Sequence, residues 1–487
     1  MNFSPELLAP EIALSFCAVV VIVLDLFLER KGTLAVVSLA GLAVAAGLAI
    51  ARWGDDPDIT FNSMLVVDQF ALFFKFLFLG AAALIILASA DYVSKFRRFQ
   101  GEYYALVLFA TVGMMLMAST AELVSIYIAL ELASISLYVL AGFLKSPESS
   151  EAGLKYLLLG AVSSAVLLFG MAFVFGVTGE THLGQIGDSI RNMGLDKLWD
   201  SPALLMGIVF LVAGFGFKIA CVPFQMWVPD VYEGAPTPVT AFLSVASKAA
   251  GFAVIMRVFY TAFGQATALS TDWGMLFAVL GVASMTVGNV VAIAQTNIKR
   301  MLGYSSIAQA GYLMVGLAAI GYAPIGDILG RSGVIFFLAS YAVTNLGAFI
   351  AIIAISNKVD SDLIDDYSGM ARRAPLLSLA LALCLISLIG LPPTAGFIAK
   401  IYIFNSAVQH DLLWLVVIAV LNSVVSAYYY LRVVKVMYLG EPASEEGVPA
   451  SAALRTALSV SLLGVLFFGI LPRYLLNIAE SAVKMLT

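Results

Sequence analysis

The sequence predicts an all-α, polytopic membrane protein, and three observations support this prediction. Of the 487 residues, 61% are hydrophobic and only 12% are charged, whereas charged residues make up ~25% of an ordinary soluble domain. The mean hydropathy is +0.99. Apolar stretches of about twenty residues, the length needed to cross a bilayer as a helix, recur along the whole chain.

Fourteen stretches match this length and are predicted to be membrane-spanning helices. Their approximate bounds are 11–28, 33–51, 70–90, 103–118, 122–144, 153–177, 203–228, 237–263, 273–295, 301–322, 332–356, 375–404, 412–438 and 455–478. An even number of spans places both termini on one side of the membrane. The longest connection, at residues 178–202, has room for a hairpin or a short surface helix but not for a soluble domain.

The basic residues of the loops predict the orientation. Loops that follow odd-numbered spans hold fifteen Lys and Arg residues, and the opposite loops hold six. Because basic residues favour cytoplasmic loops, we expect the odd loops in the cytoplasm and both termini outside. Glu6 and Glu11 stand where a cleavable signal peptide would carry basic residues, so we expect the first span to be retained.

Several classes of site are not indicated by the sequence. The net charge of −5 is mild, and it carries no signal for nucleic-acid binding. Cys17, Cys221 and Cys384 lie far apart in apolar stretches and are expected to be core residues. There is no GxGxxG motif, no P-loop and no cysteine cluster for iron–sulfur. We therefore expect neither a cofactor nor a metal in this chain.

A short internal repeat suggests two related halves. Residues 214–218 and 396–400 share the pattern GFxxK, and each copy lies beside a proline break, Pro223 in the first and Pro392-Pro393 in the second. These copies fall in spans seven and twelve, which run in opposite directions, as in transporters built from inverted repeats. The predicted units are helices 1–3 (1–102), two inverted five-helix repeats (103–263 and 273–438) and a last helix (439–487).

Four ionisable residues lie deep inside predicted spans. Glu131, Lys218 and Lys248 fall within ~5 Å of the centres of their spans, and Lys400 follows the second proline break. A charged side chain at the bilayer centre costs ~2.5–3.5 kcal/mol on insertion scales. Such residues mark an ion or proton path by default, because each charge must face the protein interior or water.

Lys218 and Glu131 are predicted to form a switchable pair. Burial favours the neutral lysine, and a carboxylate nearby favours the protonated one. Lys218 would then hold a proton while Glu131 is close and release it when Glu131 is withdrawn or neutralised. The alternative is a static ion pair that only fixes helix packing.

Other polar residues receive more ordinary interpretations. We expect Lys75 to anchor to the outer headgroups, Arg257 to be interfacial, and Asp25 to pair with Arg30 or Lys31. His182 and His410 fall in outer loops, where solvent exposure is expected. Residues that could hold water between the charges, or else make interhelical hydrogen bonds, are Asn289, Ser305, Ser306, Gln309, Tyr341, Thr344, Asn345, Asn422 and Tyr428.

Three long motifs resemble the antiporter-like membrane subunits of respiratory complex I. They are FKIACVPFQMWVPDVYEGAPTPVTAFLSVASKAAGFAVIMR at residues 217–257, TNIKRMLGYSSIAQAGYLMVGL at 296–317 and GLPPTAGFIAKIYIF at 390–404. The resemblance covers most of the chain. It implies a proton-translocating subunit of an NADH-quinone oxidoreductase in a bacterial inner membrane, with periplasmic termini.

The resemblance also implies residue roles. Glu131 matches the family's fifth-helix glutamate, Lys218 the seventh-helix lysine that it modulates, Lys248 the central relay lysine, and Lys400 the twelfth-helix lysine that passes protons outward. One departure is Gln225, which stands where family members often carry histidine after VPF. Gln225 could still orient water.

The expected partners also follow from the resemblance. The partners are other membrane and peripheral subunits of the complex, the lipid bilayer, protons and water, but not nucleic acid. NADH, FMN, iron–sulfur clusters and quinone are expected in those other subunits, so this chain would belong to a translocase without holding a redox centre.

Two other functions remain open from the sequence. The same lysines would serve a subunit of a cation/proton antiporter, although sodium needs oxygen ligands and Glu131 is the only acid placed at mid-membrane depth. The buried charges could also belong to a structural scaffold in which they only set helix register.

Overall fold

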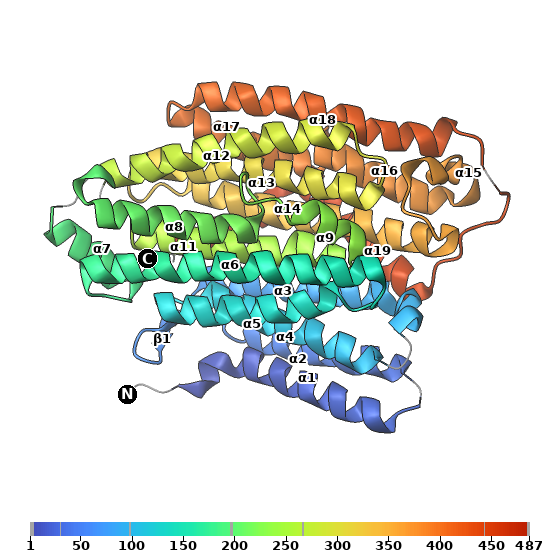
Figure 1. The fold of residues 1–487 in the computed structure, drawn as a ribbon, viewed down its shortest axis with the longest axis horizontal. Coiled ribbons are helices and arrows are strands. Elements are labelled where there is room, and N and C mark those ends of the chain that lie inside the picture. The colour runs from blue at the N-terminus through green and yellow to red at the C-terminus, as the bar shows by residue number, and fades with distance from the viewer. Residues whose placement is uncertain are drawn as a thin grey trace.

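Long apolar helices lie side by side in a layered bundle (Figure 1). The computed structural model describes residues 4–29, 31–96, 99–194, 198–264, 267–442 and 444–484. Arg30, Arg97, Arg98 and Lys197, which entered the prediction of orientation, lie outside these residues. The only strands in the described part of the chain, β1 (Asp58–Thr60) and β2 (Leu65–Val67), form an antiparallel hairpin with Ile59 opposite Val66.

The first half of the chain contains ten α-helices and one π-helix, joined by short 3-10 turns. In order the helical elements are η1 (Pro5–Leu8), α1 (Ala9–Phe27), α2 (Gly32–Ile50), α3 (Gln69–Ala88), η2 (Ser89–Asp91), η3 (Val93–Phe96), α4 (Gln100–Ser119), α5 (Leu123–Ala141), α6 (Pro147–Thr178), α7 (Leu183–Asn192), η4 (Leu198–Asp200), α8 (Pro202–Ile219), α9 (Val228–Gly234), α10 (Thr237–Phe242) and the π-helix η5 (Leu243–Ser247). The short helix α7 confirms the surface helix expected within residues 178–202.

The remaining helices complete the bundle. They are α11 (Lys248–Thr261), α12 (Thr267–Ile293), α13 (Ile298–Tyr322), α14 (Leu329–Val359), η6 (Ile364–Tyr367), α15 (Met370–Arg373), α16 (Pro375–Ile389), α17 (Ala395–Gln409), α18 (Leu413–Leu439), α19 (Ala452–Ile470) and α20 (Pro472–Lys484). Polar N-caps begin several of the helices. Asn297 accepts from the amides of Lys299 and Arg300 at the start of α13, and Ser146 accepts from Ser149 N at the start of α6.

The helices confirm a polytopic membrane protein, but not the count of fourteen spans. Twelve helical segments of the described chain are long and apolar enough to cross a membrane. The other two predicted spans fall on α13, which carries the polar Ser305, Ser306 and Gln309, and on the pair α16 and α17, which is interrupted. The predicted last span, 455–478, was too long, because α19 ends at Ile470 and Pro472 begins α20.

Both predicted proline breaks interrupt a helix. The span predicted at 203–228 ends at Ile219, where Ala220 adopts a left-handed backbone (φ 64°), and helix resumes only at Val228. In the second break α16 ends at Ile389, followed by Gly390 as the C-cap (φ 90°), and α17 begins at Ala395 after Pro392-Pro393. Glycine is needed at 390, since an added Cβ would lie 2.9 Å from Lys400 Cδ.

The connections divide between the two ends of the bundle. The β1–β2 hairpin and α7 lie at the left end in Figure 1, whereas α15 lies at the right end. We call the first the hairpin end and the second the α15 end. Because successive spans alternate in direction, residues 262–264 and the connections at 323–328 and 410–412 belong to the hairpin end.

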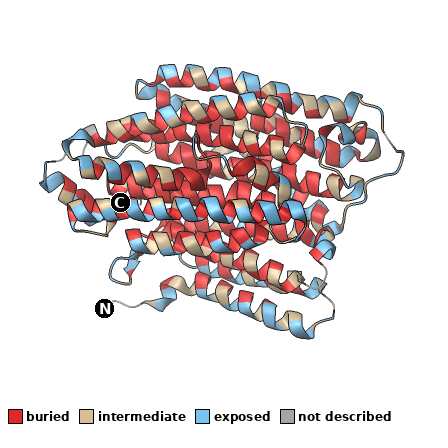
Figure 2. Cartoon of the chain, viewed as in Figure 1, coloured by how far each residue is buried: buried red, intermediate tan, exposed pale blue. Residues whose placement is uncertain are grey.

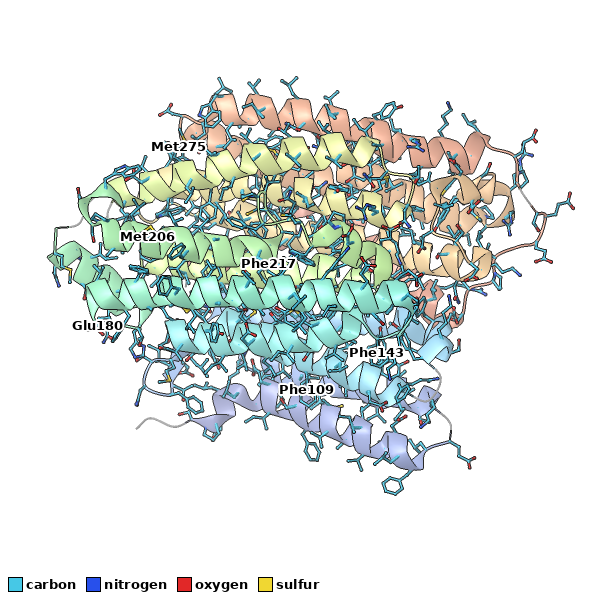
Figure 3. All side chains as sticks on the ribbon, in the orientation of Figure 1. Phe109, Phe143, Glu180, Met206, Phe217 and Met275 are labelled. Carbon is cyan, nitrogen blue, oxygen red and sulfur yellow. The ribbon has the colours of Figure 1, made fainter. Side chains whose placement is uncertain are left out.

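The outer face of the bundle is apolar and the centre is densely buried. Exposed positions run along α1, α6 and α18, and buried positions fill the middle (Figure 2). Side chains on these outer helices are mostly carbon (Figure 3), with Phe16, Val162 and Val424 each more than 60% exposed. A face of this kind suits lipid or a neighbouring membrane subunit.

Two buried ion pairs tie α3 to its neighbours at the hairpin end. Lys75 Nζ lies 2.8 Å from Glu11 Oε1 of α1, with both side chains at most 4% exposed. Arg257 of α11 donates to both oxygens of Asp68 at 2.9 and 3.0 Å, and also to the carbonyl of Ala118. The predictions that Lys75 anchors to headgroups and that Arg257 is interfacial were therefore wrong, because their acidic partners are brought to them by other segments.

A third pair confirms a prediction. Lys31 Nζ lies 2.8 Å from Asp25 Oδ1 and also donates to the Asp25 carbonyl. Asp25 thus pairs with Lys31 where α1 ends.

Breaking the Glu11–Lys75 pair is expected to destabilise the N-terminal helices. Lys75→Met leaves a buried carboxylate unpaired, and loss of one partner of such a pair costs ~3–5 kcal/mol. The double variant Glu11→Leu/Lys75→Met should recover most of that loss, because apolar replacement of both partners is often neutral. Thermal unfolding of the two variants and of Glu11→Leu alone measures the coupling. Additive losses would contradict it.

Candidate functional site

Lys218 lies at the end of α8 and is 4% exposed. Its ammonium donates to Ser134 Oγ of α5 at 2.9 Å. Glu131, one turn earlier on α5, instead accepts a hydrogen bond from Ser164 Oγ of α6. Glu131 and Lys218 thus share a neighbourhood between α5, α6 and α8, but they form no ion pair with each other in the described structure. Ser134, one turn from Glu131 on α5, is the side chain that accepts from Lys218.

Lys248 begins α11 directly after the π-helix η5. Its ammonium donates to Ser306 Oγ at 2.6 Å and to the Ser306 carbonyl of α13. The Ser306 hydroxyl also contacts the hydroxyls of Tyr232 (3.3 Å) and Tyr341 (3.2 Å). A π-helical turn widens the helix locally and is frequent at functional sites. Its position just before Lys248 was not predicted.

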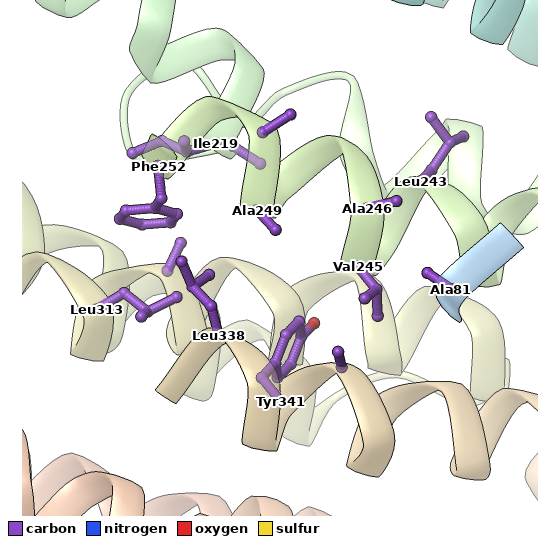
Figure 4. Close-up of a cluster of buried hydrophobic side chains, with 14 of the residues drawn as sticks. Ala81, Ile219, Leu243, Val245, Ala246, Ala249, Phe252, Leu313, Leu338 and Tyr341 are labelled. Carbon is purple, nitrogen blue, oxygen red and sulfur yellow. The ribbon is translucent and has the colours of Figure 1, made fainter. Parts of the chain in front are cut away.

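Apolar side chains surround this cationic group. Figure 4 shows Ile219, Ala249, Phe252, Leu313 and Leu338 packed between η5, α11 and the helices α13 and α14, with Tyr341 on the same side. These residues are buried. The low local dielectric strengthens each remaining hydrogen bond to Lys248 and makes an unpaired charge costly.

Lys400 turns back towards the helix break that precedes it. Its ammonium donates to the carbonyls of Leu388 (3.2 Å) and Ile389 (2.8 Å) and to Ser423 Oγ (2.8 Å). The two carbonyls belong to the last turn of α16, where no further helical turn takes them as acceptors. The Tyr312 ring lies 4.3 Å from Nζ. The break therefore supplies the acceptors that a buried lysine requires.

Polar side chains join the sites of Lys248 and Lys400. Ser305, next to Ser306, shares a hydrogen bond with Tyr430 Oη, and Gln309 Nε2 donates to Tyr430 Oη (3.5 Å) and to the Leu388 carbonyl (3.0 Å). Leu388 O is also an acceptor of Lys400. Hydroxyl groups can both accept and donate a proton, whereas the Gln309 amide can only orient its neighbours.

Helix packing brings the Lys218 side chain against α11. Gly251 of α11 lies against the Lys218 stem, since an added Cβ would be 3.3 Å from Lys218 Cγ. Gln225 Oε1, in the break after α8, and Ser247 Oγ, next to Lys248 in the chain, are buried oxygens without a hydrogen-bond partner in the protein. Both can bond a small polar species.

Of the remaining residues that were predicted to hold water, some are buried and hydrogen-bonded and one is exposed. Asn345 Nδ2 donates to Ser244 Oγ within η5 at 2.7 Å, and Asn289 bonds Tyr312, Tyr429 and Asn422. Tyr428 is 64% exposed and turns away from the interior. Tyr429 and Tyr430, which follow it, are both buried. The residues that sequence reasoning missed are Ser134, Ser164, Tyr232, Tyr312, Ser423 and Tyr430, whose types are common and whose helix register decides their role.

A charged cluster covers the α15 end of the first half. Asp230 of α9 accepts from Lys155 and Arg300 at 2.7 Å each, and Arg300 also contacts Glu233. Partial burial would raise the pKa of Asp230, but the hydrogen bonds from Lys155 and Arg300 outweigh it and hold that pKa below its usual value. Asp230 is therefore a fixed anion that ties α6, α9 and α13 together.

The fold and these buried lysines define a multi-pass membrane protein that keeps ionisable groups inside its helix bundle. Residues 120–426 match the family described as "NADH:quinone oxidoreductase/Mrp antiporter, TM". The chain belongs to this family, which confirms the resemblance seen in the sequence motifs.

Relatives extend the likeness to the full chain. The chain is 51% identical to NADH-quinone oxidoreductase subunit N of Dehalococcoides mccartyi, over 99% of both chains. It is similar to a chain of respiratory complex I from Thermus thermophilus (TM-score 0.80, 32% identity, 96% and 98% covered). It shares the fold of a chain in the Mrp complex of a Dietzia species (TM-score 0.83, 21% identity, 98% and 96% covered).

Removing the Ser306 hydroxyl is expected to weaken the site of Lys248. Ser306→Ala deletes one acceptor of the ammonium and the shared partner of Tyr232 and Tyr341. A net hydrogen bond is worth ~0.5–1.5 kcal/mol, so proton translocation should fall by about two- to tenfold. Ser340→Ala is the matched control, because Ser340 is buried and its hydroxyl has no protein partner. Pumping assays on the assembled complex compare the two, and equal rates would contradict this role for Ser306.

Proposed function

We propose that the chain is a proton-translocating membrane subunit of an NADH-quinone oxidoreductase, in which Glu131, Lys218, Lys248 and Lys400 carry protons outward. The observation that carries this proposal is a series of buried polar contacts. Lys248 contacts Ser306, the adjacent Ser305 contacts Tyr430, and Gln309 contacts both Tyr430 and the Leu388 carbonyl that accepts from Lys400. Family membership and the relatives named subunit N support it. The length of 487 residues and a lysine at position 400 also fit the relatives named subunit N.

Transport against the membrane potential requires gating. Each outward proton is opposed by ~2.3 kcal/mol per 100 mV, so an ungated path would run backwards. Lys218 donates to Ser134 in the present arrangement. A shift of α5 or α8 that brings the carboxylate to the ammonium would load a proton on Lys218. The reverse shift would send it on towards Lys248.

The proposal assigns redox chemistry to other subunits. NADH, FMN, iron–sulfur clusters and quinone would bind there, and their reaction would reach this chain as an electrostatic or conformational change at Glu131. The described residues contain no group of three or more His, Cys, Asp or Glu side chains suited to a metal. Other membrane and peripheral subunits would be its partners, with lipid covering the remaining apolar face.

Orientation and internal symmetry belong to the same proposal. The hairpin end would face the periplasm of a bacterial inner membrane, as the basic loops predict, and the α15 end the cytoplasm. Residues 103–263 and 273–438 would form the two inverted repeats, after the helices in 1–102 and before the last segment, 439–487. Each repeat would contribute one broken helix, α8 or the α16–α17 pair, to the path.

Replacing Lys218 is expected to interrupt proton transfer at the first lysine of the path. Lys218→Ala should lower proton pumping and coupled NADH oxidation by at least about tenfold, since a positioned proton-transfer group contributes ~10²–10⁴-fold in enzymes. Lys435→Ala, at an exposed position of α18, is the control. Pumping per electron is measured in the reconstituted complex. Normal pumping in a fully assembled Lys218→Ala complex would reject the function.

A cation/proton antiporter subunit is the second candidate, favoured by the Mrp branch of the family. Sodium prefers carboxylate and carbonyl ligands, and the three relay lysines would repel it. Purification of the native assembly separates the two candidates. NADH dehydrogenase activity and iron–sulfur absorbance should accompany the chain in the first case and be missing in the second.

A further inference from the structure

His410 lies at the hairpin end, immediately after α17, the helix that carries Lys400. Its Nε2 is 3.0 Å from Asp327 Oδ2, and its Nδ1 is 2.7 Å from the carbonyl oxygen of Ser406. The side chain is only 10% exposed. The prediction that His410 is solvent-exposed was therefore wrong, because the segment before α14 folds over it.

Both neighbours of the imidazole are oxygens that can only accept. A neutral imidazole has a single N–H group and can donate one hydrogen bond, whereas the imidazolium donates two. A carbonyl and a carboxylate on opposite ring nitrogens are therefore both satisfied only by the protonated ring. The geometry marks His410 as a site that holds a proton.

The surroundings keep this site partly open to the hairpin end. Asp327 is 24% exposed; its Oδ1 caps Leu329 N of α14, and its carbonyl accepts from Arg331. Four other charged groups lie in this region. Arg331 stacks on Tyr260 of α11 and donates to the carbonyl of Val483, which is next to Lys484. Asp411 is exposed, and Glu480 of α20 interacts with Tyr402. Asp327 is the only one of them that contacts the ring.

His410 and Lys400 share one helix. They are ten residues apart, which corresponds to ~15 Å along α17. Between them Ser406 is fully buried, and its hydroxyl has no protein partner although its carbonyl holds His410. A polar group in this position continues the path from Lys400 towards the hairpin end. At that end, His410–Asp327 is the only ion pair of the described residues that involves a residue next to α17.

We propose that His410 is a further proton-binding residue of the path, the last one that a proton meets after Lys400 on its way to the hairpin-end surface. The inference rests on the proposed function. In the step itself neutral His410 gains one proton and becomes the imidazolium held by Asp327 and Ser406. It then returns that proton to the outer solution and gives up one of the two hydrogen bonds.

Two measurements on the reconstituted complex test the proposal. In the first, proton pumping is followed while the pH on the hairpin-end side is varied from about 5 to 8, the range in which imidazoles titrate. Wild type should show a transition in this range that His410→Gln removes. Asp327→Asn should also alter the transition, because the imidazolium loses its counter-charge. His182→Gln is the matched control, since His182 forms no described ion pair.

In the second measurement, the thermal stabilities of wild type and His410→Gln are compared across the same pH range. This readout does not involve pumping. The imidazolium makes both hydrogen bonds, so the stability difference between wild type and His410→Gln should be largest at low pH and shrink as the pH rises. A difference that does not change with pH would overturn the assignment of His410 as a proton-binding site. Unchanged pumping and an unchanged transition in His410→Gln would remove it from the path. The proposed function would survive either result, because it is tested separately by pumping in Lys218→Ala and by purification of the native assembly.

Discussion

The structure depends on one constraint, that every cation buried in this apolar bundle needs oxygen acceptors. A charged group left unpaired in a low-dielectric interior would cost several kcal/mol. The second helix break meets this need directly, because ending α16 at Ile389 leaves the carbonyls of Leu388 and Ile389 free for Lys400. At the first break the carbonyl of Phe217 is taken by Trp227 Nε1 instead, and Lys218 relies on Ser134. The second helix break and Lys400 thus depend on each other, whereas Lys218 takes its acceptor from a neighbouring helix.

Buried cations in this chain fall into two kinds, distinguished by their partners. Lys75 and Arg257 contact carboxylates, so loss of their charge would leave an anion unpaired in the interior. Lys218, Lys248 and Lys400 contact only hydroxyl and carbonyl oxygens among the described residues. A neutral amine can still donate to such oxygens. The first kind therefore fixes the N-terminal helices to the bundle, and the second can gain and lose a proton without leaving a stranded charge.

The sequence was sufficient for most of the helices and for both breaks, because long apolar runs and proline are local signals. It failed where partners come from distant segments. Lys75 was assigned to headgroups since its partner Glu11 lies two helices away, and His410 was taken as exposed because nothing local indicates that Asp327 covers it. In the run of Tyr428, Tyr429 and Tyr430, the sequence analysis selected Tyr428, although no local signal distinguishes the three. Only the rotation of α18 decides that Tyr430 meets Ser305 while Tyr428 faces outward.

The partners of the three lysines also explain why coupling would begin in the first half of the chain. Lys248 and Lys400 are surrounded by neutral oxygens and by the rings of Tyr341 and Tyr312, so their proton occupancy responds chiefly to a charge that changes nearby. Glu131 is the acid closest to this series, and it is held by Ser164 at the α5–α6 contact, one turn from Ser134. A small movement at that contact changes the field at Lys218 first. In the proposed function the later lysines would then respond in turn, each to the charge on the one before it.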